Sequence, residues 1–556
     1  MVKNQTPSLI KVNYWFILTL IINLLAPLTN VAFAWSLKYL IDDGVQQRLQ
    51  PLYRHLLICL GIVMSFVIMH YLAQYLSNIY ADKQLQICQV QLMRRILHLD
   101  YVQFNHQATT DYQQLLLKET QQLGTDYLQG FFKITRNGVL IIYALLGMFC
   151  SEFWLATLVL LTTAIPLVLS GKIAQRSEPQ KTRVLEQEKI YSQKIREILS
   201  GYLTIKTYQV EAQLLKIYHR SLQKYGHENC KLNNQEAATA TISEFSGFLV
   251  FLVAFGGGML LTAQGYTTVG NVTAIVQLVN YVVLPINELG LLLTRFQSAR
   301  TIFQQPLWQQ LTESETPTTG VKGTFHQDLE LQQVTFTYPK ALTPTLKNLT
   351  VRFIQGHKYA ITGPSGSGKT TLIQLLLRLR LPDKGIIRVD QTSLQALDLT
   401  WWYAQLAVVQ QNVFIFNTSL LNNVTLGRPY TDAQVHTALL QAGLGDFLQK
   451  IHNDLTYPCG ENGHNLSGGQ KQRISLARAL FQAKPLILLD EATSALDAAT
   501  AEDVETKILQ NPAVTVIAIT HQTSLSPLYD QVLQLTDGHL VPLRSHKETS
   551  NKSERN

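Results

Sequence analysis

The chain has 556 residues, of which 46% are hydrophobic and only 15% are charged. Soluble globular proteins have about 25% charged residues, so this composition excludes a disordered chain and argues against an ordinary cytosolic enzyme. The mean hydropathy of +0.06 is too low for a chain that lies in the membrane throughout, and it suits one that is part membrane and part soluble. The net charge of +8 indicates either nucleic acid or a membrane surface as a partner.

The cysteines are scattered, without CxxC pairs or the spacing of a metal site. Free cysteine usually packs as a small hydrophobic residue, so we expect neither a disulfide framework nor a zinc site. The positions are Cys59, Cys88, Cys150, Cys230 and Cys459.

Six apolar segments precede residue 300, and each is long enough to cross a membrane as a helix, which takes about 20 residues. The first is too long for the core of a signal peptide and has no small-residue cleavage site, so we expect a retained helix. The predicted spans are about 14–40, 52–78, 128–150, 153–172, 243–263 and 270–294.

Lysine and arginine are concentrated in the stretches 83–136 and 172–231, whereas the turns around 150–153 and 263–270 have none. The positive-inside rule therefore predicts that both basic stretches are cytoplasmic, as are both termini of this multi-pass protein of the plasma or inner membrane. This topology explains the basic balance, so we expect no nucleic-acid partner.

The two basic stretches keep a helical spacing of apolar residues and lack clusters of Pro and Gly. We therefore expect long cytoplasmic helical hairpins with tips near 104–112 and 200–212. A polar segment follows, and it contains the turn-forming residues Pro306, Pro317 and Gly320, which indicates a domain boundary. The predicted parts are a transmembrane domain 1–303, a linker 304–328, a nucleotide-binding domain 329–545 and a polar tail 546–556.

A predicted strand at 358–362 runs into a phosphate-binding loop of the pattern G-x-x-x-x-G-K-[ST], and a helical segment follows it. Glycines in such a loop let backbone N–H groups approach phosphates. Lys369 is expected to reach the β- and γ-phosphates of ATP, and the Thr370 hydroxyl is expected to bind Mg²⁺. The candidate ATP-binding residues here are Gly363, Pro364, Ser365, Gly366, Ser367, Gly368, Lys369, Thr370 and Thr371.

An apolar strand at 486–490 ends in two carboxylates, as in the second half of a P-loop metal site. Asp490 is expected to hold Mg²⁺, and Glu491 is expected to act as the general base on the attacking water. Between the two motifs, the run Leu466-Ser467-Gly468-Gly469-Gln470 precedes a helical pattern and would form a second anion cradle at a helix N-terminus. Taken alone, it could be a simple helix cap.

Together these motifs resemble the ATP-binding cassette (ABC) transporters, specifically half-size exporters with fused membrane and nucleotide domains. The resemblance implies a dimer, since the LSGGQ segment 466–470 closes over ATP that is bound to the opposite subunit, with Asp497 of the D-loop beside it. It further implies that Tyr338 stacks on adenine and that His521 contacts the γ-phosphate. The catalytic set is then Lys369, Gln411, Glu491 and His521.

The resemblance also assigns Gln411 as the glutamine that senses Mg²⁺ and couples to the membrane domain, with Gln410 as the competing assignment. Metal ligands would be Thr370, Gln411 and Asp490. The segment 459–463 resembles the exporter-specific loop before the signature. The hairpin tips also match, with Thr110 at a position where Gly is common; the matching residues are Phe104, Thr109, Asp111, Glu197, Gly201, Lys206 and Glu211.

The fold class that we expect is a six-helix all-α transmembrane domain followed by an α/β P-loop domain with an antiparallel flank and a helical insert. The expected function is ATP-driven export by a dimer that switches a membrane cavity between inward- and outward-facing states. Alternatives are a regulatory ATP-binding protein, a subunit of a heterodimer that exports a thiol, lipid or peptide, and an importer built on the exporter fold. The sequence leaves the substrate open among drugs, lipids, peptides and a thiol.

Two acidic residues, Glu244 and Glu288, lie at similar depths on the last two predicted spans, and acidic groups in spans are costly. They could sit at headgroup level and pair with Arg295, Lys231 or solvent, or they could contribute to helix packing. The sharper hypothesis is an acidic ring at the cavity mouth that favours cationic amphiphiles.

Overall fold

The computed structural model describes residues 10–313, 320–339, 341–494, 496–520 and 526–545, and for 163–178, 243, 246, 287, 313, 526, 544 and 545 it describes the backbone without the side chains. The chain divides into a helical unit, residues 1–98 with 107–315, and a nucleotide unit, residues 99–106 with 316–556. The division at 315–316 falls within the segment that composition marks as a linker. That segment also contains α11 (Pro306–Glu313), whose Trp308 is buried.

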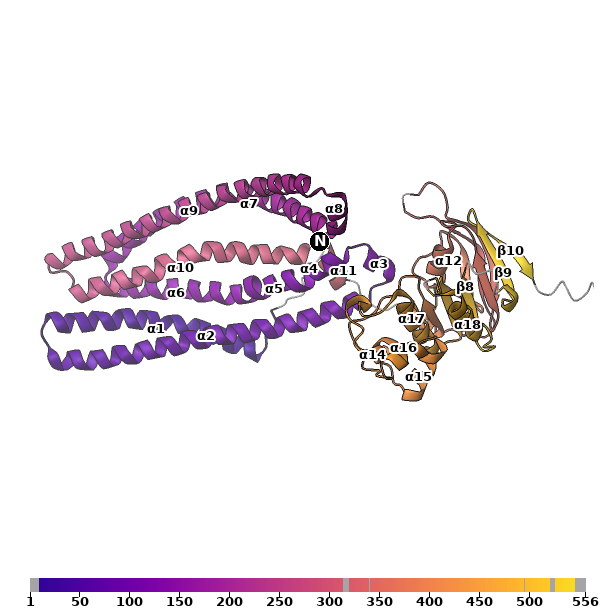
Figure 1. Cartoon of the computed structure of the whole chain (residues 1–556). Coiled ribbons are helices and arrows are strands. Elements are labelled where there is room, and N and C mark those ends of the chain that lie inside the picture. The colour runs from indigo at the N-terminus through magenta and orange to yellow at the C-terminus, as the bar shows by residue number, and fades with distance from the viewer. Residues whose placement is uncertain (1–9, 314–319, 340, 495, 521–525, 546–556) are drawn as a thin grey trace, which may run out of the picture. The chain divides into compact units, whose positions relative to one another are not determined.

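The helical unit consists of long helices joined by short turns (Figure 1). The turns that follow α1, α6 and α9 lie at the same end of this unit. The long helices are α1 (Tyr14–Val45), α2 (Leu49–Leu97), α6 (Gln129–Ser151), α7 (Phe153–Ser200), α9 (Glu211–Ala263) and α10 (Val269–Thr301).

Five helices in the described part are long and apolar enough to cross a membrane. The fourth predicted span lies in α7, whose described apolar part covers Phe153–Thr162. The third predicted span lies in one helical run, Thr109–Ser151, which extends beyond the span toward the first hairpin tip as expected and contains two π-helical segments. Its parts before α6 are α4 (Thr109–Gln114), Leu115–Glu119, α5 (Thr120–Gln122) and Leu123–Leu128.

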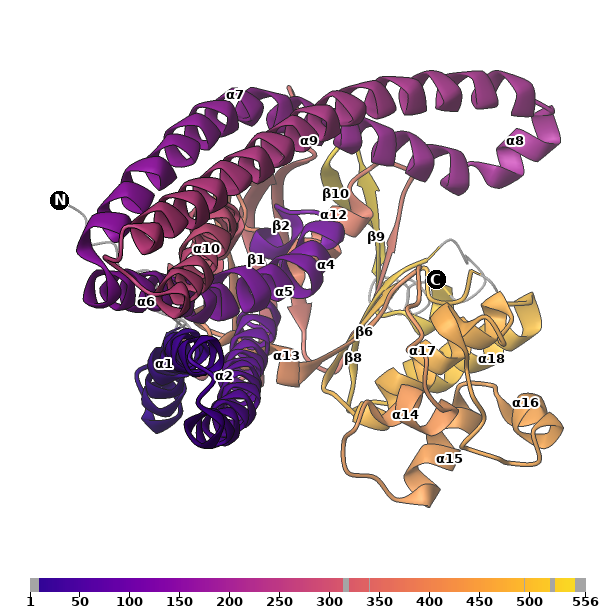
Figure 2. The same cartoon turned by 90° about the vertical axis from the view of Figure 1, so that its left-hand side faces the viewer.

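The second hairpin tip lies where the sequence predicts it. The short helix α8 (Tyr202–Tyr208) connects α7 to α9, and those two helices run side by side (Figure 2). At the first tip, α3 (Tyr101–Asn105) is followed by α4, and the Asp111 carboxylate accepts a hydrogen bond from the backbone N–H of Ala108 at 3.2 Å. Thr110 lies in the first turn of α4, a right-handed conformation that does not need glycine.

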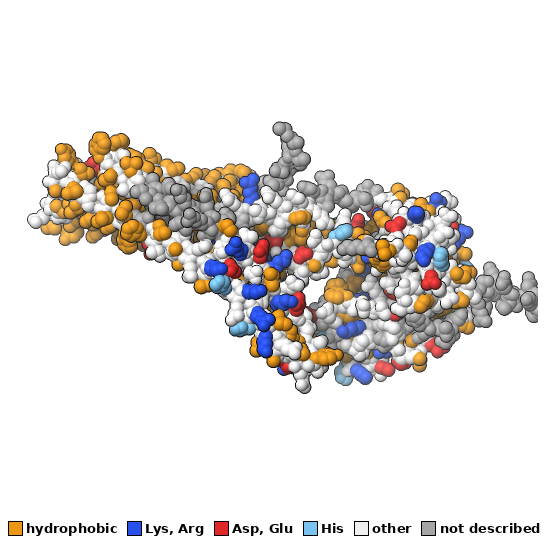
Figure 3. Space-filling view, turned by 90° about the horizontal axis from the view of Figure 1, so that it is seen from above, with side chains coloured by type: hydrophobic (Ala, Val, Ile, Leu, Met, Phe, Trp, Pro, Cys, Tyr) orange, Lys and Arg blue, Asp and Glu red, His pale blue; other side chains and the backbone are white. Residues whose placement is uncertain are grey.

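The surface of the helical unit changes along its length (Figure 3). Hydrophobic side chains cover the end with the short turns, and charged side chains gather toward the hairpin tips. Large exposed hydrophobic residues, such as Leu57, Leu60 and Phe248, are costly in water but suit a lipid environment. The prediction of a helical membrane region before an α/β domain is therefore confirmed.

The nucleotide unit contains two sheets. The larger has the order β10-β9-β3-β8-β7-β6, and it is parallel except for the pairing of β9 with β10. Its strands are β3 (Lys358–Thr362), β6 (Leu406–Val409), β7 (Leu486–Asp490), β8 (Thr515–Ile519), β9 (Gln531–Thr536) and β10 (His539–Ser545). The near-continuous burial of β7 and β8 is typical of parallel strands that are covered on both faces.

The smaller sheet is antiparallel where its pairings are described, in the order β2-β1-β4-β5, and it is the expected flank. Its strands are β1 (Asp328–Phe336), β2 (Leu346–Ile354), β4 (Lys384–Val389) and β5 (Thr392–Ser393). The helices around the two sheets are α12 (Lys369–Leu376), α13 (Leu399–Gln405), α14 (Leu420–Thr425), α15 (Asp432–Gln441), α16 (Gly445–Lys450), α17 (Gly468–Gln482) and α18 (Ala498–Leu509).

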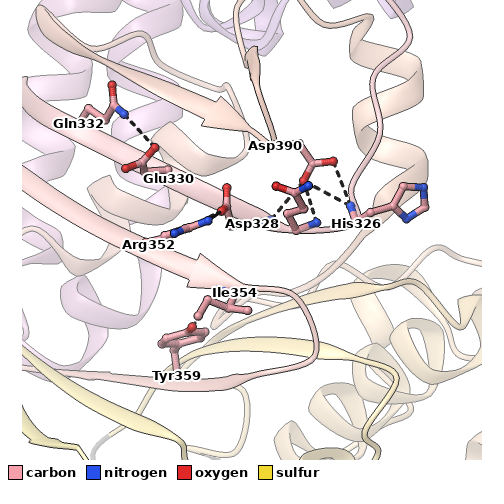
Figure 4. A network of polar contacts seen from close by, with 9 residues as sticks. His326, Asp328, Glu330, Gln332, Arg352, Ile354, Tyr359 and Asp390 are labelled. Carbon is pink, nitrogen blue, oxygen red and sulfur yellow. Dashed lines mark hydrogen bonds and ion pairs between the residues drawn. The ribbon is translucent and has the colours of Figure 1, made fainter.

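One carboxylate ties the start of β1 to the end of β4 (Figure 4). Asp390 accepts hydrogen bonds from the backbone N–H groups of His326, Gln327 and Asp328 at 2.9–3.1 Å, and from the Thr324 hydroxyl at 2.7 Å. Burial alone would raise the pKa of Asp390, but these hydrogen bonds outweigh it and hold the pKa below its usual range. The ionised carboxylate therefore stabilises this corner of the sheet.

Replacing Asp390 with Ala should lower the free energy of unfolding of the nucleotide unit by about 1–2 kcal/mol at neutral pH, because a charged acceptor is lost at a partly solvated site. A depressed folded-state pKa contributes stability above the unfolded value of about 3.9, and this contribution is lost as the pH falls through the folded pKa. The difference between parent and variant should therefore shrink below about pH 4.

The measurement is urea unfolding of the full chain in detergent, followed by tryptophan fluorescence at several pH values. Asp503→Ala is the control, since Asp503 forms only an exposed pair with Lys507, at 2.5 Å. Equal losses in the two variants, or an Asp390 effect that stays constant down to pH 3, would contradict the assignment.

Candidate functional site

The loop between β3 and α12 is shaped by glycines with positive φ angles. Gly363 has φ +150°, and a Cβ atom there would lie 2.2 Å from the carbonyl oxygen of Leu535. Gly368 has φ +104°, and a Cβ atom there would lie 2.7 Å from the Leu346 side chain. Only glycine fits both positions, so the local fold explains this part of the motif.

Lys369 is the first residue of α12, and its side chain turns back over the loop. Its Nζ donates hydrogen bonds to the carbonyl oxygens of Gly363 at 2.8 Å and Pro364 at 3.0 Å. The Ser367 hydroxyl is buried without a hydrogen-bond partner among the described residues. A loop that combines a helix N-terminus, a lysine and a spare hydroxyl fits a phosphate group.

The carboxyl ends of β3, β7 and β8 meet at one edge of the larger sheet, because these strands are parallel neighbours. Asp490 is the last residue of β7, and it interacts electrostatically with both Glu491 and Lys369. Burial raises the pKa of Asp490, repulsion from Glu491 raises it further, and Lys369 partly opposes both effects. The two acidic residues thus lie beside the phosphate-binding loop.

Glu491 is held by a side chain from the loop after β6. Gln411 donates a hydrogen bond from its Nε2 to Oε2 of Glu491 at 2.6 Å, so the glutamine at this contact is Gln411 rather than Gln410. Glu491 also has φ +50°, in the left-handed region that non-glycine residues rarely adopt. Such strained residues cluster at functional sites. Its backbone N–H donates to the carbonyl of Ile519 at 3.1 Å, which helps to hold that conformation.

Tyr338 lies close to the same loop. Its hydroxyl and that of Thr371 are 3.0 Å apart, and the guanidinium of Arg380 lies 4.6 Å from the centre of its ring. Arg380 also donates to Oε1 of Gln374 at 2.9 Å, which fixes its position. Sequence reasoning missed Arg380, since nothing in the local pattern shows that it reaches the ring.

The signature segment begins α17 with a reciprocal cap. The Ser467 hydroxyl accepts from the N–H of Gln470 at 3.2 Å, and the Gln470 side chain accepts from the N–H of Ser467 at 2.8 Å. Within α17, Gln472 donates to the Ser494 hydroxyl at 3.0 Å. Asp497 caps α18 through the N–H of Thr500 at 2.9 Å, and this hydrogen bond lowers the pKa of Asp497. The contacts of Ser467, Gln470 and Asp497 are those of helix caps, whereas Gln472 ties α17 to Ser494.

The loop before the signature contains a turn at Glu461–Gly463, in which Asn462 has φ +51°. Lys471 of α17 donates to the carbonyl of Asn462 at 2.8 Å, which ties this loop to the signature helix. Cys459 is fully buried, as expected for a small apolar residue. His521 lies outside the described residues.

Oxygen ligands of the kind that Mg²⁺ prefers come together at this edge of the sheet. Asp490 supplies a carboxylate and Thr370 a hydroxyl at the start of α12. Gln411 gives its amide N–H to Glu491, which leaves its amide oxygen for another ligand. This donor set fits a magnesium ion next to bound phosphates.

Comparison with known proteins adds the family. The family model for the ABC transporter transmembrane region matches residues 16–286, and the ABC transporter family model matches residues 346–494. An ATP-dependent lipid A-core flippase of Vibrio vulnificus is 27% identical, over 96% of this chain and 92% of its own length. The uncharacterized ABC transporter ATP-binding protein YknU of Bacillus subtilis is 25% identical, over 99% of this chain and 96% of its own.

A solved structure of a bacterial Atm1-family ABC exporter with ATP bound is similar with a TM-score of 0.80 and 22% identity, over 95% of each chain. This similarity extends over both units and shows that the fold is shared. The two family matches together cover most of the chain, one on each unit. The chain therefore belongs to the ABC transporters and is an ATP-driven multi-pass membrane transporter of the exporter type, with its membrane and nucleotide units in one polypeptide.

Proposed function

We propose that this chain works as a dimer that exports an amphiphilic substrate, with ATP binding and hydrolysis driving alternating access of a membrane cavity. The observation that carries the proposal is the grouping of Lys369, Asp490, Glu491 and Gln411 at one sheet edge in a chain that also has a membrane unit. A binding protein without turnover would not need the acidic pair beside the lysine.

In the proposed site, the backbone of 363–370 cradles the phosphates of ATP, and Lys369 moves its donors from the loop carbonyls to the phosphate oxygens. Tyr338 offers its ring to adenine, with Arg380 supporting the ring through a cation–π contact. Thr370, Asp490 and Gln411 are the proposed Mg²⁺ ligands. The ion would neutralise phosphate charge, the role that metals have in phosphoryl transfer.

Glu491 is the proposed general base. It accepts the proton of the water that attacks the γ-phosphate, and the Gln411 hydrogen bond keeps its carboxylate oriented toward that water. His521 is proposed to contact the γ-phosphate, an assignment that rests on its sequence register alone.

The remaining site residues act across the dimer in this proposal. Segment 466–470 and Asp497 of one subunit close over ATP that is bound to the other subunit. The N-terminus of α17 suits this role, since a helix start with a small residue and two glycines offers N–H groups to an anion. Closure would be passed to the membrane helices through the hairpin tips, as rigid elements transmit domain closure.

The relatives and the charge distribution support the proposed direction and substrate class. Relatives named lipid A-core flippases favour an amphiphile that moves from the inner toward the outer leaflet. The positive-inside distribution supports a cytoplasmic nucleotide unit and cytoplasmic termini. A regulatory role is disfavoured because the complete set of catalytic residue types is present, and a heterodimer with a degenerate partner is the second candidate.

Replacing Glu491 with Gln should keep ATP binding and lower turnover by about 10²–10⁴-fold, since a positioned general base contributes that much. The measurement is phosphate release in lipid discs, together with ATP retention on the isolated protein. Glu502→Gln makes the same chemical change at an exposed position on α18 and should leave turnover unchanged. Parent-like hydrolysis by the Glu491 variant would exclude it as the base.

Mixing a Lys369→Ala chain with a Ser467→Arg chain tests the shared site. If each site combines the loop of one chain with the signature of the other, a mixed dimer has one doubly damaged site and one intact site. Purified mixed dimers with two affinity tags should therefore hydrolyse ATP at up to half the parent rate, whereas neither homodimer should.

The matched control places both substitutions on one chain and mixes it with parent chains. Each site of that dimer has one damaged half, so no intact site remains. Equal activity of the two kinds of mixed dimer would contradict sites that are shared between subunits.

A further inference from the structure

A cavity of about 410 Å³ lies among α1, α2, α6 and α10 of the helical unit. Polar and charged side chains gather in its wall, although these helices are predominantly apolar where they cross the membrane. The lining residues used below are His70, Gln74, Arg136, Asn137, Asn280 and Glu288.

The cavity lies within the membrane-crossing part of the helices. Arg136 precedes the α6–α7 turn at Ser151–Phe153 by about 15 residues, or roughly 23 Å of helix. Glu288 follows the start of α10 at Val269 by about 19 residues, or roughly 29 Å. The hydrocarbon core is about 30 Å thick, so when those turns mark the outer surface, Arg136 lies in its inner half and the exposed Glu288 lies near its inner boundary. Charges at this depth are costly and mark functional pathways.

The two charges face one cavity without forming a close ion pair. Glu288 accepts a hydrogen bond from Nδ2 of Asn137 at 3.1 Å, and Asn137 is 8% exposed. Arg136 interacts electrostatically with Glu288 and with His70. Within the described part of the chain, none of the ion pairs at 4.0 Å or less includes Arg136 or Glu288.

This arrangement changes the expectation for Glu288. One alternative from the sequence was pairing at headgroup level with Arg295, Lys231 or solvent. Lys231 pairs with Glu228 at 2.9 Å, and the described neighbours of the exposed Glu288 are Asn137 and Arg136. Glu244 does not line the cavity. An acidic ring for cations would therefore have a guanidinium beside it, which repels a cationic headgroup.

We propose that this cavity binds the zwitterionic headgroup of an amphiphile, with the anionic part at Arg136 and a primary amine at Glu288; the inference rests on the proposed export function. A headgroup with separated opposite charges satisfies both side chains at once, whereas a purely anionic or cationic one meets a like charge. Gln74 and Asn280 add amide groups that can bond phosphate or carboxylate oxygens. Leu140, Leu284 and the two lining prolines, Pro27 and Pro285, offer apolar surface to the attached chain.

Glu288 can accept further hydrogen bonds from a primary amine of the headgroup. Its Oε2 accepts from Asn137, and an ionised carboxylate has further lone pairs on both oxygens. A primary ammonium donates up to three hydrogen bonds to such a group, while a quaternary ammonium donates none. The cavity should therefore distinguish phosphatidylethanolamine from phosphatidylcholine, although both are zwitterions.

The test measures equilibrium binding to the full-length protein in maltoside micelles by fluorescence anisotropy. The probes are phosphatidylethanolamine, phosphatidylcholine and phosphatidylglycerol with the same fluorescent acyl chain. We expect phosphatidylethanolamine to bind about tenfold more tightly than the other two, the factor for about one charged hydrogen bond. Equal affinities for the three probes would overturn the proposal.

Substitutions of Arg136 and Glu288 test whether phosphatidylethanolamine binds in this cavity. Arg136→Gln and Glu288→Gln should each weaken phosphatidylethanolamine binding about tenfold and remove the preference over phosphatidylcholine and phosphatidylglycerol. The exchange Arg136→Glu with Glu288→Arg keeps the net charge of the cavity and should recover part of the affinity. Lys133→Gln, one turn away on α6 and outside the cavity lining, should bind like the parent. Unchanged headgroup preference in both single variants would overturn the site.

Two further experiments are needed. The first shows whether the bound headgroup belongs to a lipid or to a soluble molecule, and the second tests the proposed export function. Competition by free phosphoethanolamine at the same concentration as the lipid identifies a soluble zwitterion, and competition by the acylated form alone identifies a lipid; both outcomes support the site. Phosphatidylethanolamine should also stimulate ATPase activity in phosphatidylcholine discs. Binding without any stimulation would count against the proposed export function while leaving the site in place.

Discussion

The alignment of parallel strand ends in the larger sheet is the constraint on which the nucleotide site depends. Because β3, β8 and β7 are neighbours in register, the loop that leaves β3 and the acids that end β7 open onto one edge. That edge concentrates opposite charges: Lys369 on one side, and Asp490 with Glu491 on the other. Burial and mutual repulsion make the acidic pair unfavourable alone, which is the condition under which a bound cation stabilises a site most. The same edge carries the positive φ of Glu491, whose strain is offset by the Gln411 and Ile519 hydrogen bonds.

In the helical unit, burial and charge have the same effects in a less polar medium. Its interior is closed mainly by apolar packing, as in the cluster that includes Val31, Leu278 and Val282. Arg136 interrupts this packing at a depth where an isolated charge is costly, and Glu288 lies near the inner boundary of the hydrocarbon core. They compensate each other at long range without collapsing into a contact pair, so each keeps hydrogen-bonding capacity toward the cavity. An apolar pair of similar size would stabilise the bundle at least as well, which argues that these residues serve binding rather than folding.

Sequence reasoning predicted the features that depend on short-range patterns. The long apolar runs, the second hairpin tip and the strand–loop–helix of the phosphate loop each follow from spacing within a few residues. The cytoplasmic extension of the third span from a tip near 104–112 also follows from this spacing, and its helix starts at Thr109, whereas the two π-helical segments at 115–128 were not predicted. The contacts of Tyr338 with Arg380, and of Asn137 with Glu288 across 151 residues, depend on how elements pack. The spacing of apolar residues within one segment does not show which residues of other elements it will contact.

The glutamine assignment shows how the two kinds of information combine. Gln410 and Gln411 are adjacent, and the sequence resemblance assigns the role to Gln411, with Gln410 as the competing assignment. Of the two, Gln411 supplies the described hydrogen bond to Glu491. Its amide must present the nitrogen to the carboxylate, which turns its oxygen toward any cation at the site. In the proposed site, a single side chain thus links the proposed general base to the proposed metal position, and a shift of the loop that carries Gln411 would disturb both at once. A change elsewhere in the protein that moves this loop is therefore expected to alter hydrolysis.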